Sequence, residues 1–207
     1  MSEAELLIIF LKVPLPGFVK TRLADRLGAE AACEAYRTLV QDLLDNLDGY
    51  RQVELRISPD DTMNQLIEDW LRPGWVCRGQ GDGDLGQRLT GAFEAAFSSG
   101  RRKVIAIGSD CPYVTLSQVA TAFERLDIAS VVLGPTVDGG YWLMGMNRFI
   151  LSLFRGISWS SEKVLSQTLE RVQTEGESVE LLDRLEDIDD WASWQRYVEK
   201  KKIAKPT

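Results

Sequence analysis

Val104-Ile105-Ala106-Ile107 is an apolar run, and Gly108-Ser109-Asp110-Cys111-Pro112 follows it directly. The four apolar residues predict a short buried strand, and the small and polar residues predict the loop that leaves it. In an open α/β sheet, ligands bind outside the carboxyl ends of the strands. Asp110 is therefore suited to hold a divalent metal against a phosphate, since Mg²⁺ takes oxygen ligands. Taken alone, Ser-Asp also fits a helix N-cap or a turn.

The composition is that of an ordinary globular protein. The chain has 207 residues, of which 44% are hydrophobic and 27% charged. This length predicts a single α/β domain over residues 1–207. The net charge of −7 argues against nucleic-acid binding, which needs a basic face. A nucleotide ligand is still compatible with it, because a local cluster of Lys and Arg, or a metal, can supply positive charge.

The chain contains no histidine. This excludes Ser-His-Asp and Cys-His nucleophile systems, His-ligated zinc sites and an imidazole general base. The groups available for catalysis are carboxylates, lysines, arginines, hydroxyls and a hard metal ion. A phosphatase of the haloacid-dehalogenase type is also excluded, because it needs Asp-x-Asp and Pro112 stands in place of the second aspartate.

Two features predict a cytoplasmic protein. The cysteines Cys33, Cys77 and Cys111 are scattered and odd in number, which favours a reducing compartment over a disulfide framework. The apolar run Leu6–Leu11 is too short to span a bilayer and lacks the basic start of a signal peptide. We therefore expect no membrane span. The sequence leaves the oligomeric state, including a homodimer, open.

Strand-like and helical segments alternate along the chain. Strands are expected at Leu6–Leu11, Val53–Ile57, Trp75–Cys77, Val104–Ile107, Val131–Leu133 and Val179–Leu182, with Tyr141–Met144 as a further strand or hairpin arm. Helices are expected at Glu30–Leu47, Met63–Leu71, Leu85–Phe97, Ser117–Leu126, Ser161–Glu175 and Trp191–Lys200. The first of these helices is expected to bury Ala31, Ala35, Leu39, Leu43 and Leu47. This rhythm predicts a mainly parallel sheet covered on both faces.

The loop after the first strand is suited to phosphates. Two prolines and Gly17 stiffen it, and Lys20 and Arg22 give it positive charge. Backbone amides together with Lys and Arg suit a di- or triphosphate. The loop is not a P-loop, because Val19 replaces the glycine required before Lys-Thr. A solvated basic turn is the alternative.

A glycine-rich segment follows the third expected strand. Gly81, Gly83 and Gly86 match the G-x-G-x-x-G motif of dinucleotide-binding loops. Asp82 and Asp84, however, would place negative charge next to the pyrophosphate of a dinucleotide. We expect a loop where a base or sugar approaches the backbone, with Asp84 or Arg88 as polar contacts. The alternative is a flexible connector in which Asp84 caps the helix.

Two later segments carry further carboxylates. Asp138, in a tight Asp-Gly-Gly turn, is placed to contact a substrate hydroxyl or amine or to approach the metal, and a plain hairpin turn is the alternative. Asp187 and Asp189 precede the last helix, where the helix dipole favours carboxylates whatever their function. Trp159, before another helix, is expected to pack against the Asp138 turn.

Five blocks in this order resemble one family. They are Pro14-x-Pro16-Gly17-x-x-Lys20-Thr21-Arg22-Leu23, Gly83-Asp84-Leu85-Gly86-x-Arg88-Leu89, Gly108-Ser109-Asp110-Cys111-Pro112, Gly134-Pro135-x-x-Asp138-Gly139-Gly140-Tyr141 and Trp159-Ser160. Over nearly the whole chain, the set resembles the bacterial CofC-like glycosyltransferase family, which has the nucleotide-diphospho-sugar transferase (GT-A) fold. Some members of this family are associated with radical-SAM genes or with arsenosugar biosynthesis.

The resemblance implies a single-domain, Rossmann-like GT-A fold that binds a nucleotide or nucleotide sugar with Mg²⁺ or Mn²⁺. Asp110 would be the metal-binding aspartate after the central strand, and Lys20 and Arg22 would lie where related nucleotidyltransferases hold phosphates. Such relatives often carry Asp-x-Asp-Thr-Pro-Glu-Asp near the C-terminus. Here Asp187-Ile-Asp189 matches the start of that motif and the next four residues do not, so Asp187 or Asp189 would complete the metal site.

These observations predict a metal-dependent glycosyltransferase-like enzyme that uses a nucleotide-activated sugar donor and a small-molecule acceptor. The alternatives are nucleotidyl transfer from an NTP to a phosphorylated acceptor, with release of pyrophosphate, or a nucleotide-binding module without catalysis. The residues expected to act are Asp110, Asp138 and Lys20 in catalysis; Pro14, Gly17, Lys20, Thr21, Arg22, Asp84, Gly86 and Arg88 at the nucleotide and its phosphates; Asp110, Asp187 and Asp189 at the metal; and Asp138, Gly139, Gly140, Tyr141 and Trp159 at the acceptor.

Overall fold

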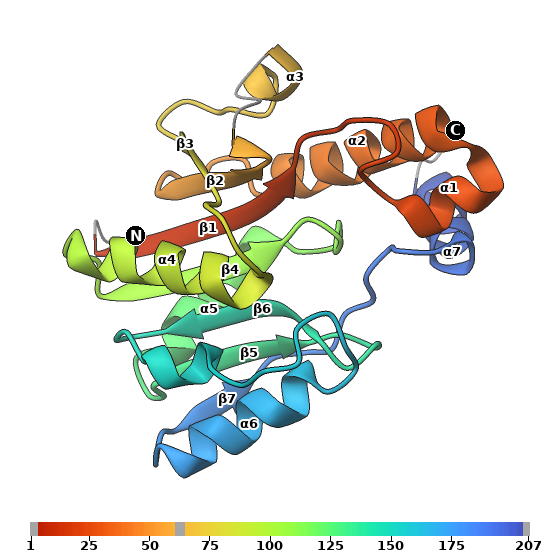
Figure 1. Ribbon diagram of the computed structural model, residues 1–207. Coiled ribbons are helices and arrows are strands. Elements are labelled where there is room, and N and C mark those ends of the chain that lie inside the picture. Colours follow the sequence, from red (N-terminus) through yellow and green to blue (C-terminus); the bar gives the residue numbers. More distant parts are fainter. Residues whose placement is uncertain (1–3, 61–64, 205–207) are drawn as a thin grey trace.

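The computed structural model describes residues 4–60 and 65–204 (Figure 1). The strands are β1 (Glu5–Lys12), β2 (Val53–Ser58), β3 (Val76–Gly79), β4 (Lys103–Gly108), β5 (Val131–Pro135), β6 (Tyr141–Met146) and β7 (Val179–Leu181). The helices are α1 (Thr21–Leu27), α2 (Ala29–Asn46), α3 (Gln65–Glu68), α4 (Leu85–Ser98), α5 (Leu116–Arg125), α6 (Val164–Thr174), α7 (Trp191–Ala204) and the 3-10 helix η2 (Leu151–Phe154). Among the described residues, no helix combines the length and the apolar character needed to cross a membrane.

The strands form a seven-stranded mixed sheet in the order β3-β2-β1-β4-β6-β5-β7. β1 lies between two parallel neighbours, so that Leu7 pairs with Val53 of β2 and with Ile105 of β4. β6 runs antiparallel to both β4 and β5, which makes it the second arm of a hairpin that begins with β5. The expected α/β class with a mostly parallel sheet is confirmed.

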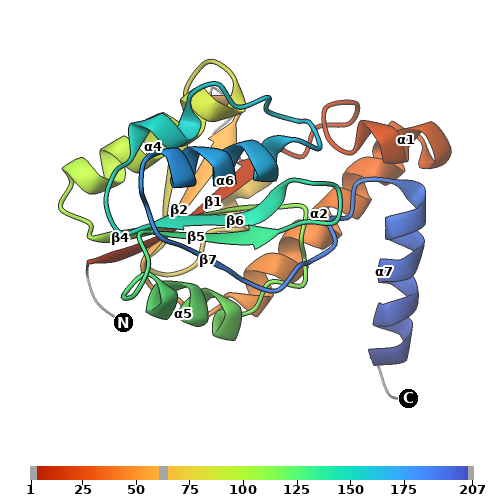
Figure 2. The ribbon, with the colours of Figure 1, turned by 90° about the horizontal axis from the view of Figure 1, so that it is seen from below.

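Helices cover both faces of the sheet (Figure 2). Because successive strand side chains point to opposite faces, Leu7 and Ile9 join one core cluster while Ile8 and Phe10 join the other. The first cluster packs against α2 and α5, and the second packs against α4, η2 and α6. This two-sided burial explains why β1 and β4 are continuous apolar runs rather than alternating ones.

The last helix does not cover the sheet. α7 stands beside α1 and α2 at one end of the molecule (Figures 1 and 2). There, the buried side chains of Tyr197 and of Ile188, just before α7, pack against Leu39 of α2. Ile188 also donates its backbone N–H to the carbonyl of Asp110, with an N···O distance of 2.8 Å. The C-terminal segment is thereby tied to the loop that follows β4.

α1 and η2 were not expected from the sequence, and two expected features differ from the observed ones. The helix expected at Met63–Leu71 is observed only as the short α3, and Met63 itself lies outside the described residues. On α2, Ala31 is exposed and its neighbour Ala32 is buried. The expected buried face is wrong at Ala31, because a strict four-residue repeat drifts by about 40° around the helix at each step.

Candidate functional site

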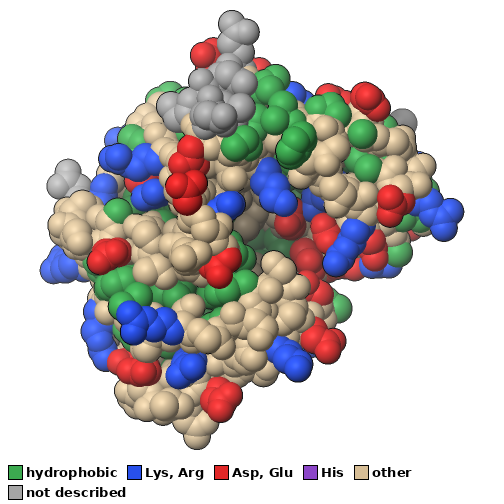
Figure 3. All heavy atoms as spheres, viewed as in Figure 1, with side chains coloured by type: hydrophobic (Ala, Val, Ile, Leu, Met, Phe, Trp, Pro, Cys, Tyr) green, Lys and Arg blue, Asp and Glu red, His purple; other side chains and the backbone are tan. Residues whose placement is uncertain are grey.

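Three loops meet at the carboxyl end of the sheet. β1 and β4 are neighbours whose last paired residues are Phe10 and Gly108. The loop after β1 leads to Lys20, the loop after β4 begins with Ser109 and Asp110, and residues 183–190 cross beside them. Figure 3 shows a hollow near the middle of this view, with acidic side chains along one side and Lys or Arg side chains at its rim. The candidate site is built here.

The ammonium of Lys20 links the three loops. Its Nζ lies 2.6 Å from Oδ1 of Asp110 and 3.8 Å from Oδ1 of Asp189, and it also donates to the carbonyl of Ile188. The Lys20 side chain is only 2% exposed. Its backbone, at the N-cap of α1, is left-handed with φ 47° and ψ 46°, a conformation that non-glycine residues adopt at an energetic cost. The contacts of the ammonium hold this residue in place.

Arg22 adds a second positive charge at the surface. Its Nη1 lies 3.0 Å from Oδ2 of Asp189, and its side chain is 77% exposed. Asp189 therefore stands between the guanidinium of Arg22 and the ammonium of Lys20. An exposed ion pair of this kind contributes little to stability, so a phosphate group can compete with Asp189 for Arg22.

A buried hydroxyl pair fixes the start of the Asp110 loop. The hydroxyl oxygens of Tyr36, on α2, and Ser109 lie 3.2 Å apart, and the Tyr36 hydroxyl accepts a hydrogen bond from the backbone N–H of Lys12 at 2.8 Å. Burial raises the pKa of Tyr36, so its phenol stays protonated. Tyr36 was not expected at the site from the sequence. The feature of the sequence that could have indicated Tyr36 is its hydroxyl among the apolar residues on the buried face of α2.

Further carboxylates surround the Lys20–Asp110 pair. Burial raises the pKa of Asp187, and the negative charges of Asp138, Asp110 and Asp189 raise it further. Asp138 itself is exposed, and its Oδ1 accepts hydrogen bonds from the Thr136 hydroxyl and, at 3.1 Å, from the Gly140 N–H. Asp138 thus shapes the turn between β5 and β6 while its charge acts on Asp187.

The donor set suits a hard divalent cation that a substrate also binds. Among the described residues, no three His, Cys, Asp or Glu side chains form a ready-made metal cage. Mg²⁺, however, is usually bound by one or two carboxylates plus phosphate oxygens and water, which is what Asp110 with Asp187 or Asp189 can offer. Cys111 is buried beside them and its pKa is raised, first by burial, so it stays a thiol. Carboxylate oxygens are therefore the available ligands.

The glycine-rich segment lies at the ends of the neighbouring strands β2 and β3. Asp84 is the N-cap of α4, and its side chain accepts from the backbone N–H of Gln87 at 2.9 Å in a complete capping box. Nη1 of Arg88 lies 3.2 Å from the Ser58 hydroxyl and 3.3 Å from Oε1 of Gln80. The Nε of Arg88 is buried without a hydrogen-bond partner among the described residues. The capping interpretation of Asp84 is confirmed, and ligand contacts of Asp84 and Arg88 stay predictions.

Trp159 packs against the start of α4. A Cβ on Gly86 would lie only 2.1 Å from Nε1 of Trp159, so this contact requires glycine. Trp159 also meets Tyr141 edge-on, with ring centroids 6.5 Å apart. Gly139, with φ 90°, leaves room for the carbonyl of Glu162. Trp159, Tyr141 and Gly139 have clear packing roles, and their contact with an acceptor stays a prediction. The contact of Gly86 with a nucleotide also stays a prediction.

The other residues expected at the phosphates lie in the first loop. The carbonyl of Pro14 accepts from Nη2 of Arg37 at 3.4 Å. Gly17 is exposed with φ 83°, and Thr21 is the exposed first residue of α1. None of their described hydrogen bonds reaches Asp110 or Asp189, so their phosphate contacts also stay predictions.

A family profile described as "Uncharacterized protein conserved in bacteria (DUF2064)" matches residues 43–161, which is more than half of the chain. The chain belongs to the DUF2064 family. No curated protein matches this DUF2064 chain.

The DUF2064 chain resembles several solved structures. A protein from Desulfovibrio desulfuricans G20, provisionally assigned as a nucleotide-diphospho-sugar transferase, is 32% identical, with a TM-score of 0.85 over 91% of this chain and 84% of that one. The inositol-1-phosphate CTP transferase of T. maritima is 17% identical, with a TM-score of 0.58 over 100% and 99% of the two chains. The manganese complex of Rv0371c from Mycobacterium tuberculosis H37Rv is 13% identical, with a TM-score of 0.56 over 94% and 98%.

These similarities confirm the nucleotide-diphospho-sugar transferase fold and agree with the CofC-like resemblance. They also support the expectation of an enzyme of the transferase class. The two more distant structures share the fold, while the CTP in the name of one enzyme and the manganese bound to the other belong to those proteins.

Proposed function

We propose that this DUF2064 protein is a divalent-metal-dependent transferase that uses a nucleotide-activated sugar and a small-molecule acceptor. The observation that carries the proposal is the Lys20 ammonium, buried 2.6 Å from Asp110 at the carboxyl end of β4. A buried cation beside a half-exposed carboxylate, at the place where α/β sheets bind ligands, suits a phosphate group shared between protein and metal.

Lys20 and Arg22 would stabilise the charge on the nucleoside diphosphate that leaves. Lys20 is desolvated and fixed by three acceptors, so it can act on a phosphate without reorganisation. Arg22 is exposed and offers its guanidinium from the mouth of the site. The two residues therefore cover the inner and the outer side of a diphosphate.

Asp110, with Asp187 or Asp189, would hold Mg²⁺ or Mn²⁺. When bound, such an ion supplies charge neutralisation at the phosphate oxygens. Burial and then the neighbouring carboxylates raise the pKa of Asp187, and the negative charge of these carboxylates favours a cation at this position. Asp138 has a second carboxylate oxygen outside the turn that it forms, and this oxygen would orient the acceptor hydroxyl or amine or remove its proton.

Nucleotidyl transfer is the second candidate. The shared fold of the T. maritima inositol-1-phosphate CTP transferase favours it, because that enzyme's name describes a CTP-dependent reaction on a phosphorylated acceptor. The same Lys20, Arg22 and Asp110 would then act on an NTP, and pyrophosphate would leave instead of a nucleoside diphosphate. The two reactions differ in donor and in product.

The melting temperature measured with a panel of nucleoside triphosphates and nucleotide sugars, each with Mg²⁺ or Mn²⁺, distinguishes glycosyl transfer from nucleotidyl transfer. A ligand that binds the folded state at about 100 times its Kd adds roughly 2.7 kcal/mol, which raises the Tm by roughly 5–10 °C at this chain length. We expect the largest shift with nucleotide sugars and metal. A larger shift with NTPs, together with pyrophosphate release, would support nucleotidyl transfer.

Asp110→Asn tests the site itself, and Asp127→Asn is a matched control. Asp127 is similarly exposed and pairs with Lys103 at 2.7 Å, at the other end of the sheet. We expect Asp110→Asn to lose the metal-dependent shift and turnover while Asp127→Asn keeps both. Unchanged metal-dependent turnover in Asp110→Asn would refute the assignment. Binding with metal but without release of either product, over a broad acceptor set, would indicate a binding module.

A further inference from the structure

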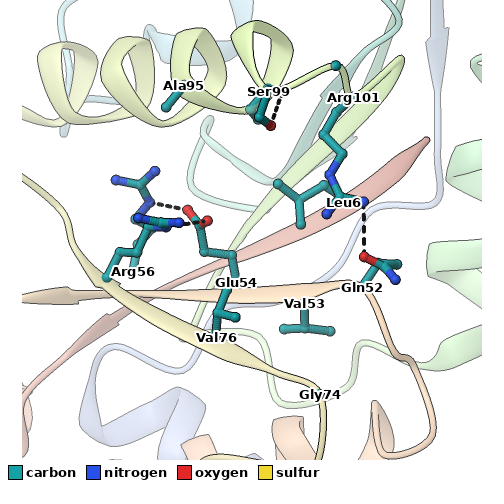
Figure 4. Close-up of a pocket in the computed structure, with 13 residues that line it drawn as sticks. Leu6, Gln52, Val53, Glu54, Arg56, Gly74, Val76, Ala95, Ser99 and Arg101 are labelled. Atoms are coloured by element: carbon teal, nitrogen blue, oxygen red, sulfur yellow. Dashed lines mark hydrogen bonds and ion pairs between the residues drawn. The ribbon is translucent and has the colours of Figure 1, made fainter. Parts of the chain in front are cut away.

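A cavity of about 830 Å³ lies away from Asp110, on the part of the sheet formed by β2 and β3 (Figure 4). Its lining includes Leu6 and Val76, near the amino ends of β1 and β3, and Ala95 and Ser99, near the carboxyl end of α4. The candidate active site, in contrast, lies at the carboxyl ends of these parallel strands. The cavity is therefore a separate feature of the molecule.

The charged side chains that line this cavity are mostly basic. Arg56, Arg78 and Arg101 face it together with one carboxylate, that of Glu54. These four groups sum to two positive charges in a chain whose net charge is −7. A local positive field in an acidic protein favours an anionic ligand.

Glu54 holds two of the arginines through their Nε atoms, and Figure 4 shows its contact with Arg56. Its Oε1 lies 2.5 Å from Nε of Arg56, and its Oε2 lies 3.1 Å from Nε of Arg78. Arg56 and Arg78 are direct partners in the parallel pairing of β2 and β3, so two like charges stand side by side, an unfavourable arrangement. One carboxylate neutralises only one of them.

The ends of both guanidiniums keep donors for a ligand. Nη1 of Arg56 donates to the carbonyl of Gly79 at 3.0 Å. Within residues 4–60 and 65–204, Nη2 of Arg56 and both Nη atoms of Arg78 have no hydrogen-bond partner. The Arg56 side chain is 11% exposed and that of Arg78 is 65% exposed. One guanidinium therefore forms the inner part of the cavity wall and the other lies at its opening.

We propose that this cavity binds a small molecule carrying a phosphate or carboxylate group, held by Arg56 and Arg78. Guanidiniums fixed through Nε present their remaining N–H groups in the planar geometry that such anions accept. The volume lies within the range of small-ligand pockets, about 300–1,000 Å³, which favours a small molecule over a protein partner. No metal is required, because the arginines carry the positive charge.

The test is calorimetric titration of the full chain in EDTA with inorganic phosphate, pyrophosphate and citrate. Arg78→Ala removes the exposed guanidinium, and Arg148→Ala is its control, because Arg148 is similarly exposed and also paired with one carboxylate. Arg22→Ala reports binding at the candidate active site. We expect Arg78→Ala to weaken one binding event at least tenfold, while Arg148→Ala and Arg22→Ala leave that event unchanged. The affinity for phosphate compared with that for citrate shows whether the cavity prefers a phosphate or a carboxylate group.

Glu54→Gln gives a second test with the opposite sign. Glutamine keeps one oxygen that can accept from an Nε–H group and removes the negative charge that competes with the ligand, so anion binding should become at least threefold tighter, provided that the Tm shows a folded protein. Binding that is unaffected by Arg78→Ala, or that is lost only in Arg22→Ala, would overturn the proposal. A dimer in sedimentation experiments that dissociates in Arg78→Ala would also overturn it, because the cavity would then be an interface between copies.

Discussion

At the scale of single residues, Lys20 sets the character of the candidate site. Its ammonium already neutralises Asp110 in the protein alone, and its burial means that water contributes little to solvating that charge. Its left-handed backbone aims the side chain inward at the start of α1. A phosphate that enters the site thus meets a positive charge whose position is fixed in advance, which is the arrangement that lowers reorganisation during group transfer.

Lys20→Met should lower turnover by about 10²- to 10³-fold, the usual effect of removing one preorganised group that stabilises developing negative charge. The variant should remain folded, because Asp110 is half exposed and can be solvated by water. Steady-state kinetics and the Tm measure the two effects separately. Lys201→Met is the control, since Lys201 also pairs with a carboxylate, Asp42, but lies on α7. Wild-type turnover in Lys20→Met would contradict the role assigned to this ammonium.

At the scale of elements, the start of α4 joins helix capping to loop packing. Asp84 and Gln87 form the capping box, so this helix begins at a defined residue. Within this first turn, the backbone at Gly86 is open enough for the indole of Trp159 to lie against it. The loop before α6 is thereby fastened to the loop after β3, and both border the carboxyl ends of the strands.

Gly86→Ala should destabilise the protein by about 1–3 kcal/mol, the usual cost of overpacking, because the new methyl group would collide with Trp159. Gly91→Ala, in the same helix, should stabilise it by about 0.5–1 kcal/mol, because a Cβ there meets no atom within 4 Å and alanine is the better helix former. Urea denaturation measures both changes. Equal effects of the two substitutions would show that the Trp159 contact does not require glycine.

At the scale of the whole molecule, the candidate site depends on segments that are far apart in the sequence. Lys20 lies 90 positions from Asp110 and 168 positions from Ile188, yet its ammonium contacts both. The sheet order makes β1 and β4 neighbours, and the packing of α7 against α2 brings the C-terminal segment to the same place.

Hydrogen exchange should therefore respond to a ligand in two distant segments at once. With a bound nucleotide and divalent cation, we expect slower amide exchange in residues 17–24 and in residues 185–190, because both border the same phosphate position. Mass spectrometry of peptides from these segments measures the effect, and α5 serves as the reference, since it packs on a face of the sheet. Protection confined to one of the two segments would contradict a shared site.

The fold class was accessible from sequence because its signal is local. Apolar runs of strand length, such as residues 104–107, alternate with helical spacing, and this alternation already predicts parallel strands covered on both faces. Errors arose where the local signal was weak. The buried face expected on α2 is wrong at Ala31, and α1 was not expected. The described part of the helix expected from Met63 contains only the short α3.

The amino-acid pattern alone predicts the α/β class, excludes histidine chemistry and puts Asp110 at the end of a strand. The folded chain adds that the Lys20 ammonium is the partner of Asp110, that the Ile188 carbonyl also accepts from this ammonium and that Tyr36 supports Ser109. These contacts do not follow from the sequence, because the periodicity of apolar residues reports only which face of a single helix or strand is buried. The partner of a charged side chain depends instead on distance and burial. Distance and burial depend in turn on which strand ends become neighbours and on which side chains the folded core removes from water.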